Sequence, residues 1–90
     1  MSAGSASDEV AVVIPARNEA DRIQATVTAA LGLSDVALVI VVDDGSKDGT
    51  AAAARQAGAV VMRHTRNRGK GAAMETGAEA VRLLDQRDGG

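Results

Sequence analysis

Polar side chains that could bind a ligand gather in three short segments of this 90-residue sequence. The segment DDGSKDGT, residues 43–50, places two adjacent carboxylates directly after an apolar run. The segments PARNEAD, residues 15–21, and RHTRNRGKG, residues 63–71, also follow apolar runs. In the last segment Lys70 stands between two glycines, which suits anionic oxygens, because glycine lets a ligand approach the backbone and lysine supplies a positive charge. The three segments together are the candidate binding site.

Three strands and three helices are predicted to position these segments, from short β-branched apolar runs and from helical apolar periodicity. The predicted strands cover residues 10–14, 36–42 and 59–62. The predicted helices cover residues 18–31, 50–57 and 72–84. The order β-α-β-α-β-α implies an α/β fold of three layers, with a Rossmann-like parallel sheet between helices. Ligands bind such sheets beyond the carboxyl ends of the strands, where all three polar segments are expected.

The composition indicates a single globular domain with a thin aliphatic core. Apolar residues make up 46% of the chain, and there is no Phe, Tyr, Trp or Cys, so neither a disulfide nor a thiolate metal site can form. A formal net charge of -2 gives no general electrostatic support for nucleic-acid binding. Residues 1–8 lack the pattern of a signal peptide and are expected to be a disordered tail. No apolar run is long enough to span a membrane, and we expect a cytoplasmic protein.

Each candidate residue also has an ordinary structural interpretation. Asp43 and Asp44 could serve only as turn formers, because Asp is favoured where a strand gives way to a helix. Asn18 could be the N-cap of the first helix. The basic residues 63–71 could form a solvated loop in which His64 is an ordinary loop residue. A single His without any Cys makes no metal site.

Two glycine signatures of nucleotide-binding proteins are excluded. A Rossmann dinucleotide site needs G-x-G-x-x-G after the first strand, where this chain has PARNEA. A P-loop needs G-x-x-x-x-G-K-[ST], but His64 and Gly71 stand at its first glycine and its Ser/Thr position. A nucleotidyltransferase of similar fold would carry a loop rich in Gly, Arg and Lys after the first strand, and PARNEAD argues against it.

Three motifs together resemble one enzyme family. VVIPARNEAD, VIVVDDGSKDGT and NRGKGAAMETG, in this order and spacing, resemble the N-terminal half of family 2 glycosyltransferases. These enzymes have the GT-A fold and use nucleotide-diphospho-sugars. The branch with polyprenyl-phosphate sugar transferases and glucosyl-phosphoglycerate synthases is the most similar. The resemblance spans residues 10–81 and implies that residues 9–86 form the nucleotide-sugar-binding half of a GT-A domain, with residues 87–90 as a frayed end.

The resemblance also implies roles for single residues. The first motif would wrap the base and ribose of a UDP- or GDP-sugar, with Glu19 accepting a hydrogen bond from a ribose hydroxyl. Asp44 would contact the base, and Lys70 would offset the diphosphate charge. Many relatives carry an aromatic residue where Arg17 stands, and a guanidinium plane can stack on a base in its place. The nucleotide-sugar-binding residues implied in this way are Pro15, Ala16, Arg17, Asn18, Glu19, Asp43, Asp44 and Lys70.

The resemblance implies neither a catalytic residue nor a metal ligand within this sequence. The family's D-x-D-type metal motif follows a fourth strand, which we expect beyond residue 90, and a full-length relative would use Mg²⁺ or Mn²⁺ there. The isolated chain is therefore expected to bind a donor without transferring sugar. The alternative is a non-catalytic nucleotide-binding or interaction module that kept the fold. The strand at residues 10–14 would keep one unpaired edge, which favours self-association.

Overall fold

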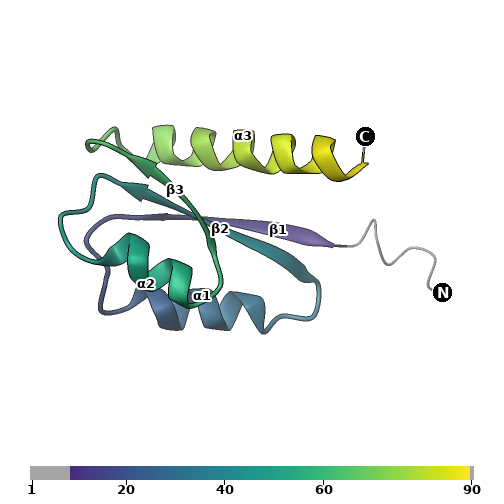
Figure 1. The fold of residues 1–90 in the computed structure, drawn as a ribbon, viewed down its shortest axis with the longest axis horizontal. Helices are drawn as coiled ribbons and strands as arrows, with labels where there is room; N and C mark the ends of the chain where they lie inside the picture. Colours follow the sequence, from purple (N-terminus) through teal and green to yellow (C-terminus); the bar gives the residue numbers. More distant parts are fainter. Residues whose placement is uncertain (1–8, 90) are drawn as a thin grey trace.

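The computed structural model describes residues 9–89, with side chains described through residue 84. Three strands and three helices alternate along the chain as predicted (Figure 1). Their bounds are β1 Val10–Ala16, α1 Ile23–Leu31, β2 Val36–Asp44, α2 Thr50–Gln56, β3 Val60–His64 and α3 Lys70–Gly89. The tail predicted at residues 1–8 lies outside the described residues. Between residues 9 and 89, no helix is both long enough and apolar enough to cross a membrane.

The three strands form one parallel sheet in the order β1-β2-β3. β2 lies in the centre, with its Ile40 opposite Val13 of β1 and Val60 of β3. Residues 39–44 of β2 are all buried. Burial on both faces explains why this run is apolar without alternation. The sheet and its helices confirm the predicted Rossmann-like α/β fold.

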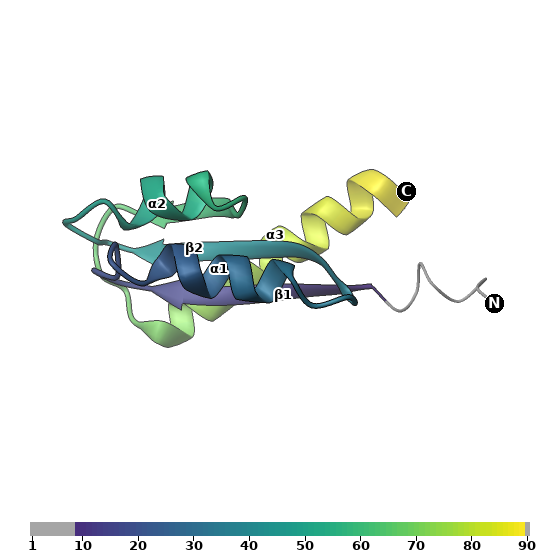
Figure 2. The same cartoon turned by 90° about the horizontal axis from the view of Figure 1, so that it is seen from below.

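Helices cover both faces of the sheet, so the molecule has three layers (Figures 1 and 2). Successive strand side chains point to opposite faces of a sheet. Val39 and Val41 of β2 therefore pack in one cluster with α1 and α2, whereas Ile40 and Val42 pack in a second cluster with α3. Both clusters contain only aliphatic side chains, as the composition predicted.

Small residues on α3 let this helix lie close to the sheet. A Cβ atom added at Gly77 would lie 2.2 Å from Cγ1 of Val13 on β1. Ala73 and Ala80, one turn before and one turn after Gly77, are buried on the same side of the helix. The distance between α3 and the sheet is therefore set by the absence of a side chain at Gly77.

All three strands end later than the sequence predicted. β1 continues through Pro15 to Ala16, which proline permits because β1 pairs on one edge only among the described residues. β2 continues through Asp44, and β3 ends at His64. The last residues of the strands are polar or small, so apolar periodicity did not reveal them. His64 is consequently a strand residue, and its prediction as an ordinary loop residue was wrong.

The helices also differ from prediction at their ends. α1 begins at Ile23, five residues after Asn18, so the predicted N-cap role of Asn18 was wrong. Asn18 has φ 55°, in the left-handed region, and its side chain contacts a different loop. At the other end of the chain, α3 continues to Gly89, so residues 87–89, expected to fray, are helical.

Candidate functional site

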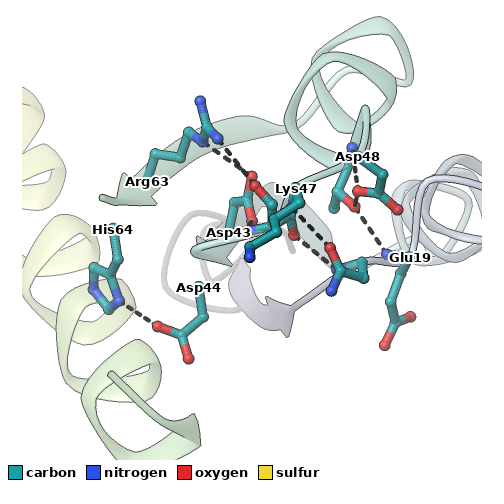
Figure 3. Close-up of polar contacts among 10 residues, drawn as sticks. Glu19, Asp43, Asp44, Lys47, Asp48, Arg63 and His64 are labelled. Atoms are coloured by element: carbon teal, nitrogen blue, oxygen red, sulfur yellow. Dashed lines mark hydrogen bonds and ion pairs between the residues drawn. The ribbon is translucent and has the colours of Figure 1, made fainter. Parts of the chain in front are cut away.

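The adjacent carboxylates at the end of β2 point to opposite faces of the sheet (Figure 3). Because side chains alternate along a strand, Asp43 follows the direction of Val41, and Asp44 follows that of Val42. Asp43 therefore lies on the α1 and α2 side, near Arg63, and Asp44 lies on the α3 side, near His64. The two carboxylates cannot act as a pair on one ligand atom.

Asp44 holds the loop between β3 and α3. Its Oδ1 accepts hydrogen bonds from the Arg68 N–H at 2.8 Å and from His64 Nδ1 at 2.7 Å, and its Oδ2 accepts one from the Gly69 N–H at 2.8 Å. These hydrogen bonds, first the one from Arg68, hold the pKa of Asp44 below its ordinary value of 3.8. Asp44 is therefore ionised at neutral pH. A carboxylate has about four acceptor positions, so one on Oδ2 remains for a ligand.

His64 links Asp44 to α3. The side chain is buried, with Nδ1 facing Asp44 and Nε2 lying 2.8 Å from Oγ1 of Thr76. His64 stands opposite Asp44 in the register of β2 and β3. A prediction that extended the third strand to His64 would have placed this residue beside Asp44. The sequence did not indicate the extension, because the polar residues Arg63 and His64 do not continue the apolar run of the strand.

Asp43 is occupied by contacts within the fold. Its Oδ1 accepts a hydrogen bond from the Ser46 N–H at 2.9 Å, which is the turn-forming role considered as the alternative for this residue. Its Oδ2 forms an ion pair with Nε of Arg63 at 3.2 Å but accepts no hydrogen bond from the described residues. Arg63 also donates to the Ser46 carbonyl at 3.2 Å. Asp43 thus fixes the start of the β2–α2 loop.

Asn18 joins the β1–α1 loop to the β2–α2 loop. Its backbone N–H donates to Oγ of Ser46 at 2.8 Å, and its Oδ1 accepts from the Lys47 N–H at 2.8 Å. A residue at φ 55° can form this reciprocal pair, and asparagine tolerates that conformation better than most residues. The left-handed turn is therefore the reason for an Asn at this position.

A second pair of contacts joins the same two loops. Oγ1 of Thr50 accepts the Glu19 N–H at 2.8 Å and donates to Oδ1 of Asp48, while Oδ2 of Asp48 accepts the Ala20 N–H at 3.2 Å. Asp48 also accepts the Thr50 N–H at 3.1 Å at the start of α2. These hydrogen bonds, first the one from the Thr50 hydroxyl, lower the pKa of Asp48. The Glu19 side chain takes no part in these contacts and forms an exposed ion pair with Arg22 at 3.8 Å.

A cavity of about 190 Å³ opens at the carboxyl ends of the strands, beside the first turn of α3. Five of the eight predicted binding residues line it: Pro15, Ala16, Arg17, Asp44 and Lys70. The other lining residues are Asn67 and Gly69, which belong to the candidate segment 63–71, and Ala73, which the sequence did not indicate. The remaining predicted residues, Asn18, Glu19 and Asp43, lie outside its wall. The cavity thus brings two cationic side chains and one carboxylate together from three loops.

The loops around this cavity are in direct contact. A Cβ atom added at Gly45 would lie 2.5 Å from the backbone nitrogen of Asn67, and Gly45 has φ 77°. Only glycine allows the β2–α2 loop to approach the β3–α3 loop this closely. The β3–α3 loop itself turns at Gly69, which has φ 96° and precedes Lys70.

The described side chains do not fit a divalent cation. In the part of the chain that the structure describes, no three His, Asp or Glu side chains lie close enough to share a metal ion. Asp44 already accepts hydrogen bonds on both oxygens, and Asp43 points to the other side of the sheet.

A larger cavity of about 640 Å³ lies at the opposite end of the sheet, between the first residues of the strands and the second half of α3. Apart from Glu9 and Arg82, its lining residues are Val10, Ala11, Ala37, Leu38, Val60, Ala78, Val81 and Leu84. This wall is aliphatic and has no group of polar side chains that could orient a ligand. The cavity at the carboxyl ends is therefore the candidate site.

Comparison with known sequences identifies relatives of this chain. The sequence profile described as Glycosyl transferase family 2 matches residues 11–83. An uncharacterized protein of Methanocaldococcus jannaschii is 42% identical over 76 residues, which cover 84% of this chain and 31% of that protein. The succinoglycan biosynthesis protein ExoU of Rhizobium meliloti is 42% identical over 74 residues, which cover 77% of this chain and 22% of that protein.

Solved structures with the same fold are also similar in sequence. Glucosyl-3-phosphoglycerate synthase from Mycobacterium tuberculosis, in complex with Mn²⁺, UDP and glucosyl-3-phosphoglycerate, matches with a TM-score of 0.67 and 33% identity. The same enzyme with Mn²⁺, UDP-glucose and phosphoglyceric acid gives a TM-score of 0.66 and 34% identity. Each match covers 80% of this chain and 29% of the enzyme, so the chain spans less than a third of these relatives. The family match and the shared fold show that the chain belongs to glycosyl transferase family 2.

Proposed function

We propose that this chain binds a UDP- or GDP-sugar at the carboxyl ends of its strands, as the nucleotide-sugar-binding part of a glycosyltransferase. The observation that carries the proposal is the meeting of Arg17, Asp44 and Lys70 at one cavity, each from a different one of the three polar segments. Parallel α/β sheets bind ligands at this edge. The mycobacterial relative has been crystallised with UDP and with UDP-glucose, which supports a nucleoside diphosphate as the ligand class.

The charges around the cavity suggest how such a ligand would lie. Lys70 at the start of α3 would offset the diphosphate charge, helped by the positive end of the helix dipole. The open acceptor position on Oδ2 of Asp44 would take an N–H of the base. The guanidinium of Arg17 would stack on the base, and the carboxylate of Glu19, which is paired with Arg22 only at 3.8 Å on the surface, would accept from a ribose hydroxyl. Asn18 and Asp43 would act through the loops that they hold.

Transfer of the sugar is proposed for the longer enzymes of the family and not for this chain alone. Mg²⁺ or Mn²⁺ would be held by residues outside those described, because the described carboxylates do not fit the ion.

The cytoplasmic location remains a prediction. Self-association through β1 also remains a proposal, supported by the single paired edge of this strand within the described sheet. Sedimentation velocity at increasing protein concentration would test it, and a monomer at all concentrations would contradict it.

Calorimetric titration with UDP and GDP tests the binding proposal. We expect weak binding of at least one nucleotide, and Lys70→Ala should weaken it by about 1–3 kcal/mol, the usual cost of losing a hydrogen bond to a charged group. Lys47→Ala is the matched control, because Lys47 is an exposed lysine on a neighbouring loop that does not line the cavity. Its substitution removes the same charge from the protein and should leave the affinity unchanged.

Two results would contradict this assignment. Equal losses in the Lys70→Ala and Lys47→Ala variants would show that only net charge attracts the nucleotide. Absence of binding for both nucleotides at millimolar concentration would remove the proposal and favour an interaction module instead.

A further inference from the structure

His64 is a buried titratable residue for which the proposed binding mode has no direct use. It does not line the cavity, but it contacts Asp44, which does. On one side its Nδ1 lies 2.7 Å from the carboxylate of Asp44, and on the other its Nε2 lies 2.8 Å from the hydroxyl of Thr76 on α3. His64 thus connects the end of β2 to the body of α3.

We propose that His64 is a positioning residue for nucleotide binding, which orients Asp44 and thereby fixes the loop backbone that presents Lys70. This inference rests on the proposed function for the identity of the ligand. The link to the loop is direct, because the same carboxylate oxygen that faces His64 also accepts the Arg68 N–H, and the other oxygen accepts the Gly69 N–H. Lys70 is the next residue and the first of α3.

The loop contains glycines that depend on external contacts for a fixed conformation. Gly69 adopts φ 96°, and Gly71 follows two residues later. The Gly69 N–H is shared between Asp44 and the loop's own Asn67, whereas the Arg68 N–H is held by Oδ1 of Asp44. A carboxylate that can rotate about its own bond needs a further contact to hold its plane. The Nδ1–H of His64 supplies that contact to the same oxygen, Oδ1.

The second ring nitrogen of His64, Nε2, contacts α3. With the proton on Nδ1, Nε2 accepts a hydrogen bond from the Thr76 hydroxyl. Thr76 precedes Gly77, where α3 lies close to β1, so its hydroxyl is held at a fixed distance from the sheet. His64 therefore contacts the sheet through Asp44 and the helix through Thr76, whereas the loop amides of Arg68 and Gly69 contact Asp44.

Two conservative substitutions separate these contacts. In His64→Asn the side-chain amide nitrogen stands near the place of Nδ1, so the contact with Asp44 is kept and the one with Thr76 is lost. In His64→Gln the amide nitrogen stands near the place of Nε2, so the contact with Thr76 is kept and the one with Asp44 is lost. If His64 acts through Asp44, only the Gln variant should loosen the loop.

The first measurement needs no nucleotide. Hydrogen exchange of the Arg68 amide, followed by NMR on the full chain, should be about tenfold faster in His64→Gln than in the wild type, as expected for the loss of one charge-assisted hydrogen bond. His64→Asn should exchange as the wild type does. Equal exchange in both variants would overturn the proposal, because a purely structural histidine does not distinguish the two nitrogens in this way.

The second measurement connects the positioning of the loop to binding. Titration with UDP and GDP should show about tenfold weaker affinity for His64→Gln and nearly unchanged affinity for His64→Asn. The effect of His64→Gln should largely disappear in a Lys70→Ala background, because both changes act on one contact. Full additivity of the two changes would contradict the proposed route through Lys70.

The two measurements distinguish failure of this inference from failure of the proposed function. If the wild type binds neither nucleotide but the exchange difference is present, the binding proposal fails and the positioning of the loop stands. If His64→Gln does not fold, His64→Leu replaces it, because leucine makes neither contact. The Arg68 amide should exchange faster in His64→Leu and at the wild-type rate in Thr76→Val, which loses only the contact with the helix. Equal exchange in these two variants would overturn the proposed route through Asp44.

Discussion

Because α3 lies close to β1, we expect replacement of the helix glycine at this contact to destabilise the protein, whereas replacement of a helix glycine usually stabilises one. A Gly→Ala change in a helix interior normally stabilises a protein by about 1 kcal/mol, because alanine has the higher helix propensity. At Gly77 the new methyl group would lie 2.2 Å from Cγ1, 3.1 Å from Cγ2 and 3.2 Å from Cβ of Val13. Rotation about χ1 of Val13 could place its hydrogen where Cγ1 lies, but a methyl group at 3.1 Å and Cβ at 3.2 Å would remain, and the valine would leave its native rotamer.

Relief of the overlap requires either this change of rotamer or movement of α3 away from the sheet. Overpacking of this kind costs about 1–3 kcal/mol, which outweighs the gain in propensity over most of that range. We therefore expect Gly77→Ala to lower the free energy of unfolding by up to about 2 kcal/mol. In a domain of this size, a loss of about 1 kcal/mol lowers the midpoint of thermal unfolding by about 4–8 °C.

Urea unfolding followed by circular dichroism would measure the change. Gly71→Ala is the control within the same helix, because a Cβ atom at Gly71 meets nothing within 4 Å. That variant should be unchanged or slightly stabilised. In a Val13→Ala background the obstructing methyl groups are gone, and Gly77→Ala should become neutral or stabilising. A Gly77→Ala variant as stable as Gly71→Ala in the wild-type background would refute the close packing of α3 on β1.

Three further changes test the loops around the cavity. Gly45→Ala should lower the midpoint of thermal unfolding and weaken nucleotide binding, because its Cβ would lie 2.5 Å from the nitrogen of Asn67 in a left-handed conformation that costs non-glycine residues about 1–2 kcal/mol. Thr50→Val should reduce the free energy of unfolding by about 1–3 kcal/mol, since it leaves a loop N–H without its acceptor, and Thr50→Ser should restore it. The lowered pKa values of Asp44 and Asp48 contribute stability that is present above their unfolded values and lost as the pH falls through the folded values. Unfolding at a series of pH values should therefore show stability falling below about pH 4, less steeply in Asp48→Asn, and an equal slope in that variant would contradict the assignment.

The architecture was predictable because its signals are local. A β-branched apolar run such as residues 36–42 and the helical spacing of Ile23 and Val27 each specify an element within about ten residues of sequence. The alternation of elements then fixes a parallel sheet, and the sheet fixes which loops meet at the carboxyl edge. This is why the sequence alone was enough to place Arg17, Asp44 and Lys70 at one site.

The polar contacts between loops were not predictable in the same way. His64 was assigned to a loop because Arg63 and His64 break the apolar run of β3, although both residues still pair with β2. Asn18 was assigned as a helix cap because its type and its place before an amphipathic stretch fit that role. Its actual partners, Ser46 and Lys47, lie 28 and 29 residues away in sequence. Sequence patterns within one element carry no information about such contacts.

Most polar side chains of DDGSKDGT hold the loops around the cavity and do not line it. Only Asp44 in this segment lines the cavity, whereas the side chains of Asp43, Ser46, Asp48 and Thr50 bind backbone groups of their own and neighbouring loops. A chain of this size without aromatic residues buries only about 60% of its unfolded surface, and its thin aliphatic layers end before the loops begin. Packing alone therefore cannot hold three loops in register. Buried or partly buried hydrogen bonds can hold the loops in register. Each bond fixes the relative orientation of two loop segments, and movement of the loop would leave a donor or acceptor unsatisfied. The motif thus combines one residue that lines the cavity with four whose side chains hold the loops around it.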